Sequence, residues 1–241
     1  MDNSIYIVLS KQLALFREMD VTANNLANAN TTGYDSEHIL FTSYLTKDVN
    51  LGKTNPMSMA QDVSTYRDTQ DGPLNATGNP LDLAIQGNGY FAVQTPLGTR
   101  YTRAGNFQIR GDGILTNAEG YPVLDISNQP IAFDENVQTV DVGAAGNIKA
   151  NGEDFTQLKV VKFDNPQLLE RLSGGLYKSD VTPSDADEAT VVQGSLEGSN
   201  VSSVMELTHM IDISRQVTNT AQFMADMYDL ETKTADAWAA Q

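Results

Sequence analysis

Apolar residues near the start of the chain recur at the spacing of a helix. Their steps of 4, 4, 3, 7 and 3 keep them on one helical face. No proline or glycine interrupts this segment before Gly33, and glycine suits the left-handed backbone of a helix end. The pattern predicts a helix over about Ser4–Asn30, whose apolar face holds Ile5, Leu9, Leu13, Phe16, Ala23 and Leu26.

A second helix is predicted at the other end of the chain, because Val201–Ala240 contains no proline or glycine. Asn200 can cap its start, and Ser203 with Glu206 offers a capping box. A Met stripe at helical spacing is typical of adaptable packing rather than of a binding box. The heptad-like residues are Val204, Leu207, Ile211, Thr218, Ala221, Ala225 and Tyr228.

The middle of the chain, Leu81–Phe163, has the texture of short strands. Alternating or continuous apolar runs are separated by turns rich in Gly and Asp, which supply the positive φ angles of tight hairpins. The runs are LDLAI, YFAVQT, RYTRA, NFQIR, ILTN, VQTVDV and TQLKVVKF, and the turns are PLGT, GDG, AEGYP and NGED. This pattern predicts a compact antiparallel β module.

Together these zones predict an α+β fold. Long N- and C-terminal helices would pair as a coiled-coil-like layer, with a central antiparallel β domain and extended connectors. Gly and Pro punctuate both connectors, and Leu51–Gln61 and Thr182–Thr190 read as mobile or extended. The expected boundaries are 1–34 for the N-terminal helix, 35–80 and 174–199 for the connectors, 81–173 for the β domain and 200–241 for the C-terminal helix.

Two helices alone bury only one seam. Val8, Leu15 and the methionines of the last helix would remain uncovered, and the chain has no further helix to cover them. Symmetric packing of more copies of the same chain would bury these residues.

The stretch ANNLANANTTGY, 23–34, holds four asparagines within seven residues. Asn is a poor helix former, because its amide competes for backbone hydrogen bonds. Asn24 and Asn28 share a helical face and Asn25 lies beside them, so buried amides could fix helix register or subunit contacts. The alternative is simple fraying, in which Asn and Thr end the helix.

Composition narrows the function classes. The 241 residues include 15 Lys and Arg against 31 Asp and Glu, a net charge of −16. This argues against binding nucleic acid or an anionic membrane surface. Without cysteine the chain has no disulfide, thiol nucleophile or thiolate metal site. The sequence contains no run of about 18 apolar residues, so no membrane-spanning helix is predicted. The N-terminus does not resemble a cleavable secretory signal.

Enzyme readings find little support in the sequence. The two histidines, His38 and His209, lie far apart, and HExxH, GxSxG and GxxxxGK[ST] motifs are missing. Gly87–Ala92 matches GxGxxA, but the β-like YFAVQTP follows where a dinucleotide site needs a helix. His209 reads as a packing or interfacial residue. Asp112, Asp125, Asp134 and Glu135 lack calcium-loop spacing.

A β-module enzyme or carbohydrate-binding protein with helical ends remains an alternative. Its mark would be a cleft with convergent carboxylates or aromatics. Trp238 would be unusual on a solvated tail; it reads either as local packing on its own helix or as an anchor against a neighbouring subunit.

Three motifs carry a resemblance to a known family. ANNLANANTTGYDSEHILF resembles the N-terminal motif of flagellar basal-body rod and hook proteins, with matching residues Ala23, Asn24, Asn25, Ala27, Asn28, Thr31, Gly33 and Tyr34. Gly78–Leu124 resembles their β-domain motif, and Val191–Val217 their C-terminal motif. The N-terminus SIYIVLSKQLALFREMD is more similar to the proximal-rod branch than to the distal-rod branch. Segment 35–80 departs most from the shared pattern.

The resemblance implies a structural axial subunit of the bacterial flagellum, not an enzyme, with no cofactor and no metal. Such proteins pass unfolded through the flagellar type III export apparatus and polymerise helically. Their helices form an inner tube inside the β domain, and the rod transmits torque across the periplasm. The implied partners are copies of the chain and neighbouring proximal- and distal-rod proteins. The implied location is the periplasmic rod of the basal body, reached without a cleaved signal peptide.

Residue pattern and resemblance together select the residues expected at subunit interfaces: Leu13, Phe16, Asn24, Asn25, Leu26, Asn28, Gly33, Tyr34, Asn200, Val204, Leu207, Ile211 and Trp238. The alternative within the same class is a distal-rod or other axial or hook-type protein.

Overall fold

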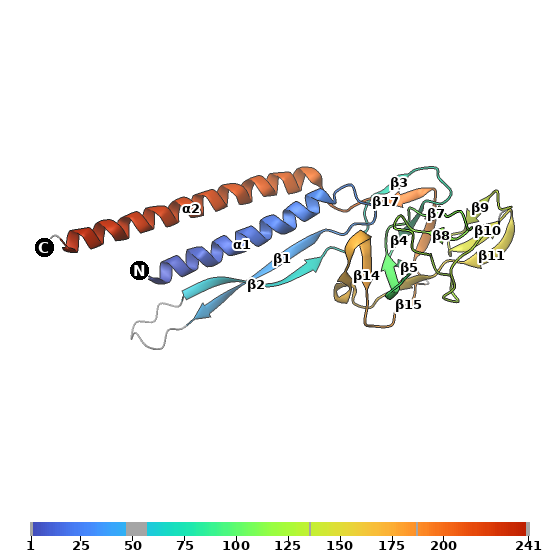
Figure 1. The fold of residues 1–241 in the computed structure, drawn as a ribbon, viewed down its shortest axis with the longest axis horizontal. Helices are drawn as coiled ribbons and strands as arrows, with labels where there is room; N and C mark the ends of the chain where they lie inside the picture. The colour runs from blue at the N-terminus through green and yellow to red at the C-terminus, as the bar shows by residue number, and fades with distance from the viewer. Residues whose placement is uncertain (1, 47–56, 135, 187, 240–241) are drawn as a thin grey trace. The chain divides into compact units, whose positions relative to one another are not determined.

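The computed structural model describes residues 2–46, 57–134, 136–186 and 188–239 (Figure 1). Helices and strands are both present, and the strands of the central region pair antiparallel, as the α+β prediction expected. The chain divides into two compact units, and its backbone passes between them four times. Unit 1 holds residues 1–27, 37–68 and 202–241, and unit 2 holds residues 28–36 and 69–201.

Unit 1 contains the two long helices and a hairpin. Its elements are α1 (Asp2–Ala27), β1 (Glu37–Thr46), β2 (Met57–Arg67) and α2 (Ser203–Ala239). Strands β1 and β2 pair antiparallel from Glu37↔Arg67, with a register shift at Leu40/Phe41. Helix α1 contacts α2 and also both strands of the hairpin. The hairpin lies within the segment 35–80, where the sequence indicated only an extended connector.

The faces that the helices bury within unit 1 are not those expected from the sequence. Leu9, Leu13 and Phe16 of the predicted α1 face are exposed, while Leu15 is buried. Many of the half-buried or buried positions follow a second heptad on each helix: Val8, Gln12, Leu15, Met19, Thr22 and Leu26 on α1, and Met210, Ile213, Val217, Thr220, Met224 and Met227 on α2. Each helix therefore carries two stripes at heptad spacing, and the periodicity could not tell which one faces inward.

Helix α1 ends earlier than the sequence suggested. Its last residue is Ala27, and Thr31 N donates to Asn28 O over 3.0 Å in the turn that follows. Gly33 has the expected left-handed backbone, with φ of 64°, but it lies six residues beyond the helix and so does not cap it. Side chains that bond locally, such as Asn28 and Thr31, stop the helix first.

Unit 2 is built from short antiparallel strands. Its largest sheet has six strands in the order β13-β14-β6-β5-β12-β15; a three-stranded sheet has the order β11-β10-β9, and β16-β4, β17-β3 and β7-β8 form pairs. The strands are β3 (Leu74–Ala76), β4 (Leu83–Gln86), β5 (Tyr90–Thr95), β6 (Gly98–Thr102), β7 (Gln108–Ile109), β8 (Leu115–Thr116), β9 (Val140–Val142), β10 (Asn147–Ala150), β11 (Glu153–Gln157), β12 (Val160–Lys162), β13 (Glu170–Arg171), β14 (Leu176–Lys178), β15 (Ser184–Asp185), β16 (Thr190–Gln193) and β17 (Ser195–Glu197).

The predicted runs match these strands closely, and YFAVQT coincides with β5. Two short 3-10 helices, η1 (Pro166–Leu168) and η2 (Ser173–Gly175), separate β12 from β14. The NGED turn joins β10 to β11 with positive φ at both Asn151 and Gly152, as a tight hairpin requires. The segment 174–199, expected as a connector, supplies β14–β17 to unit 2.

The core of unit 2 lies on both faces of β5. Phe91 and Val93 point into a cluster with Ile85, while Tyr90 and Ala92 point into a second cluster with Tyr177. The Phe91 and Phe107 rings meet edge to face at 5.1 Å between centroids. A strand buried on both faces reads as a continuous apolar run, which explains why β5 lacks the alternation of a half-exposed strand.

Replacing Phe91 with Ala should destabilise unit 2 by about 3–5 kcal/mol, because a fully buried ring leaves a cavity. Chemical unfolding followed by near-UV circular dichroism measures the loss. Leu97→Ala, at the exposed β5–β6 turn, is the matched control and should change stability by less than about 0.5 kcal/mol. Equal effects of the two changes would show that the core is not centred on β5.

Candidate functional site

The motif segments from the two ends of the chain meet in unit 2. Gly33 N donates to Glu197 O over 2.9 Å, and Asn200 N donates to Tyr34 O over 3.3 Å. The side chain of Asn200 accepts from Ser36 N at 2.8 Å and donates to Gln70 O at 3.1 Å. Asn200 therefore joins separate stretches of unit 2 rather than capping α2, which begins at Ser203.

Gly33 is required by this close approach. A Cβ at this position would lie 2.6 Å from the Arg103 carbonyl carbon and 2.7 Å from Ala104 N. Its φ of 64° also lies in the left-handed region that side chains disfavour. Sterics and backbone conformation both exclude other residues, so the glycine of the N-terminal motif marks a contact between backbone segments.

A buried charge cluster lies beside this contact. Arg103 binds Glu197 (Nη1 to Oε2, 3.2 Å) and Asp71 (Nη2 to Oδ1, 3.3 Å), and both Arg103 and Glu197 are almost fully buried. Glu197 also accepts from Gly72 N at 3.1 Å, and Asp71 accepts from Gly87 N at 2.8 Å. Each carboxylate thus bridges the guanidinium to a backbone N–H, which ties several loops to Arg103.

Burial and the neighbouring charges shift the pKa values of Arg103 and Glu197. Burial alone lowers the pKa of the Arg103 guanidinium, but Glu197 and the other acids outweigh burial and the pKa is raised. Burial raises the pKa of the Glu197 carboxyl, and Arg103 and the Gly72 N–H offset part of that rise. Arg103 therefore stays charged in the interior of unit 2 and depends on its acidic partners.

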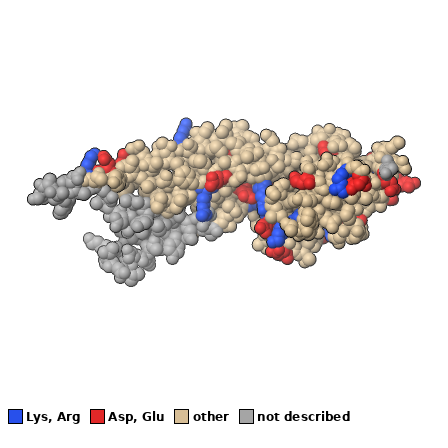
Figure 2. Space-filling view, in the orientation of Figure 1, with Lys and Arg blue, Asp and Glu red and all other residues tan. Residues whose placement is uncertain are grey.

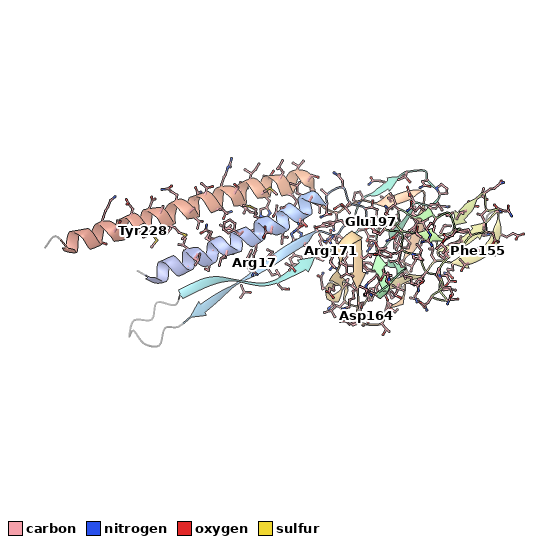
Figure 3. All side chains as sticks on the ribbon, in the orientation of Figure 1. Arg17, Phe155, Asp164, Arg171, Glu197 and Tyr228 are labelled. Atoms are coloured by element: carbon pink, nitrogen blue, oxygen red, sulfur yellow. The ribbon has the colours of Figure 1, made fainter. Side chains whose placement is uncertain are left out.

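Tyr34, the last residue of the N-terminal motif, is buried. The Arg171 guanidinium lies 3.8 Å from the centre of its ring, a cation–π contact. Figure 3 labels Arg171 and Glu197. The motif Gly33–Tyr34 is thus held by contacts with β13, with Glu197 at the end of β17 and with Asn200 after it.

The asparagines of the motif have different surroundings. Asn25 is 1% exposed, and its amide donates to Glu37 O (2.8 Å) and accepts from Glu37 N (3.0 Å). This pair of bonds holds the start of β1 against the end of α1 within unit 1. Asn24 is exposed and donates to Asp20 O of its own helix at 3.1 Å. Asn28 accepts from Thr31 Oγ1 at 3.1 Å in the turn after α1.

The remaining expected interface residues lie mostly on the outer faces of the helices. Leu13 is 58% exposed and Ile211 46%, and Leu26 is half-buried. On the face shown in Figure 2, charged side chains are sparse over the two helices. The Trp238 side chain lies outside those that the structure describes. The exposed large apolar residues are Ile7, Leu9, Leu13 and Phe16 on α1, and Val204, Met205, Leu207, Ile211, Phe223, Tyr228 and Leu230 on α2.

Polar contacts also join the two helices. His209 Nε2 of α2 lies 3.0 Å from Glu18 Oε1 of α1. A groove of unit 1 is lined by both helices, with Val8 and Lys11 on α1 and Gln216, Asn219, Thr220 and Phe223 on α2. None of the described helices is long and apolar enough to cross a membrane.

The sequence candidates for other chemistry serve local structure. Strand β5 follows Gly87, and a Cβ on Gly89 would lie 3.0 Å from Val160 Cγ1, so the GxGxxA match is a tight turn between strands. Asp112 pairs with Arg110, and Asp125 Oδ1 accepts from Ser127 N and Gln129 N. Within the described ranges, no three His, Asp or Glu side chains gather to hold a metal ion; Glu135 lies outside them.

One hollow of unit 2 brings carboxylates near an aromatic ring, the arrangement named for the carbohydrate-binding alternative. Asp134, Glu153, Asp154 and Phe155 line it, and Figure 3 labels Phe155. Two of its polar residues have partners within the chain. Lys149 Nζ lies 3.4 Å from Asp154 Oδ1. The side chain of Asn151, also in the lining, bonds to residues 136, 138 and 139.

Comparison with known proteins gives the family. Three family models match in chain order: "Flagella basal body rod protein" over residues 11–34, "Flagellar hook protein FlgE/F/G D1 domain" over 84–150, and "Flagellar basal body rod FlgEFG protein C-terminal" over 192–235. A flagellar basal-body rod protein FlgF of Caulobacter vibrioides is 36% identical over 95% of each chain. This chain belongs to the FlgF-like flagellar basal-body rod proteins.

Other rod proteins agree with this assignment. The FlgF protein of Mesorhizobium japonicum is 36% identical over 93% of this chain and 92% of its own length. The FlgG protein of Bacillus subtilis is 31% identical over 88% and 90%. The higher identity to the FlgF proteins than to this FlgG protein favours FlgF over the alternative, a FlgG-like distal-rod protein. The chain is a structural rod subunit of the flagellar basal body and associates with other rod proteins.

Sequence reasoning missed the buried charges of this site. Arg103 and Glu197 stand 94 residues apart, and nothing in either local pattern indicates that they pair. One available signal was the position of Arg103 between apolar strands, since an ionic residue there must be paired or exposed. Asp71 and Arg171 carry no such signal, because both lie in polar segments.

Asn25→Ala should expose the Glu37 N–H to exchange. The change removes the side chain that accepts from Glu37 N and donates to Glu37 O. An unpaired buried group costs about 1–3 kcal/mol, so we expect exchange at Glu37 N to accelerate strongly. Asn24→Ala is the control next in sequence: it leaves both bonds between Asn25 and Glu37 in place and should leave exchange at Glu37 N unchanged. Equal exchange in both variants would mean that Asn25 does not hold β1.

Glu197→Gln should destabilise unit 2 by about 3–5 kcal/mol, because it leaves the buried Arg103 charge with less compensation. Thermal unfolding of the full chain measures the effect. Glu188→Gln removes an exposed carboxylate from the same region and should be nearly neutral. If Glu197→Gln were as stable as the control, Asp71 alone would suffice to compensate Arg103.

Proposed function

We propose that this chain is a proximal-rod subunit that polymerises helically through the outer faces of α1 and α2. One observation supports this above others. Each helix has an inner stripe used within unit 1 and a second stripe whose large apolar residues are exposed. A helix that is apolar on more than one side is typical of burial by further elements, and the described residues contain no α-helix besides α1 and α2.

The same proposal places residues 1–34 and 200–241 in an inner helical domain. There α1 and α2 would pair as a coiled-coil-like layer, with the β domain of residues 81–173 outside it. The 3-4 spacing of the inner stripes supports such pairing, because heptad positions face a partner helix along its length. The residues expected at interfaces include Leu13 and Phe16 on α1 and Val204, Leu207 and Ile211 on α2.

Partners and route follow from the family. The outer faces would contact copies of this chain and neighbouring proximal- and distal-rod proteins. The chain would reach the periplasmic rod unfolded, through the flagellar type III export apparatus and without a cleaved signal peptide, and would there transmit torque. The lack of cysteine supports such a route, because no disulfide can form in the oxidising periplasm.

Ile211→Asp tests the outer face of α2. In the isolated chain Ile211 is half-exposed, so the folded monomer should tolerate the change. In a rod the carboxylate would be buried in every subunit interface, at several kcal/mol each. We expect an exported, folded protein that forms no rod and no downstream filament. Occupancy in purified basal bodies, read by quantitative immunoblotting, is the measurement.

Thr208→Asp is the control, since it adds the same charge one turn away at an exposed polar position of α2. It should assemble close to wild type. Wild-type occupancy of Ile211→Asp would contradict an interface at this face. Loss of folding in the monomer, read by circular dichroism, would instead show that Ile211 stabilises the single chain.

A further inference from the structure

The segment 190–200, called the latch below, makes an unusual number of long-range bonds in unit 2. Strand β16 pairs with β4 through Val191↔Ile85, and β17 pairs with β3 through Leu196↔Asn75. Between these strands Gly194 N donates to Asp82 O at 2.8 Å, and Gly194 O accepts from residues 77 and 78. The latch thus supplies the pairing partners of the first two strands of unit 2.

Side chains of the latch reach further stretches of the chain. Gln193 donates to Pro80 O and Val140 O, both at 2.8 Å, and accepts from Val142 N at 3.1 Å. Glu197 binds the buried Arg103, and Asn200 bonds to the segment after α1. The latch therefore contacts residues spread from 33 to 144, all of which precede it in the chain.

Without the latch, the rest of unit 2 would be left with unsatisfied groups. Strands β3 and β4 would lose their paired strands. Ile85 would lose Val191 from its cluster, and Arg103 would lose its buried carboxylate partner. Exposed apolar surface, unpaired backbone and an uncompensated buried charge each oppose folding. Locally paired elements, such as β5 with β6, would have to persist alone, and isolated hairpins are marginally stable.

We propose that the latch controls when unit 2 folds: the unit becomes stable only once residues 190–200 are free to close it. A chain that is made or threaded from its N-terminus then keeps unit 2 unfolded until residues 190–200 have been made or have emerged. Contacts between residues so distant in sequence also slow folding. The use of this delay for export rests on the proposed function, whereas the folding behaviour does not.

Pulse-labelled hydrogen exchange during refolding of the full-length wild-type chain tests the proposal. The latch reporters are the amides of Val191, Gly194 and Gly198, which bond to residues 144, 82 and 73. The core reporters are the amides of Ala92, Gln94 and Leu124. We expect both sets to become protected in one kinetic phase. Protection of the core reporters in an earlier phase would overturn the proposal.

A variant adds an equilibrium test in the full chain. Gln193→Ala removes three side-chain bonds of the latch and should accelerate native-state exchange of both reporter sets by the same factor, about tenfold or more. Gln167→Ala, on η1 and outside the latch, should leave both sets unchanged. Faster exchange confined to the latch reporters would show that the latch opens alone and would refute its control of folding.

These measurements use the free chain, so they decide the latch whether or not the chain enters a rod. Basal-body occupancy of Ile211→Asp decides the proposed assembly face independently. If Ile211→Asp entered basal bodies normally, the assembly proposal would be refuted. The latch proposal would still hold if the latch and core reporters became protected together.

Discussion

The buried contact between Arg103 and Glu197 organises unit 2. Glu197 binds the guanidinium with its side chain and Gly33 N with its backbone, so the same residue joins both terminal motifs to the β core. A guanidinium in the interior must keep its carboxylates. This requirement fixes the position of the chain at residues 71, 103 and 197 together, and Gly33 can approach only because it lacks a Cβ.

Much of the fold could be predicted because local physics determines it. Strand β5 is visible in the sequence as an apolar run between turns, and Asn151–Gly152 supplies the two positive φ angles of the hairpin that joins β10 to β11. The long helices follow from the lack of Pro and Gly over tens of residues. The role of the Asn-rich motif at subunit contacts stays a prediction. Within the chain its members have different partners: Asn25 bonds to Glu37, and Asn24 donates to Asp20 O.

The features that the sequence did not predict depend on contacts between residues far apart in the chain. Each helix has two stripes of the same period. On α1 the inner one is the more polar, with Gln12 half-buried and Thr22 buried in it, so selecting by hydrophobicity picks the outer stripe. On α2 both stripes are largely apolar, so hydrophobicity does not distinguish them. The hairpin of β1 and β2 was missed because its strands mix polar and apolar residues, and its packing against α1 comes from tertiary structure. The pairing of Arg103 with Glu197 has no local signal at all.

The division of the chain into units has a mechanical consequence. Because unit 1 takes residues from the start, from the hairpin and from the end, the backbone crosses between the units at 27–28, 36–37, 68–69 and 201–202. Most neighbouring domains are joined by a single linker, which bears any force alone. Here a load passed from one unit to the other divides among four covalent strands, two of which are bonded to each other through Tyr34 and Asn200. Four connections suit a rod subunit, because no single crossing has to carry the whole load.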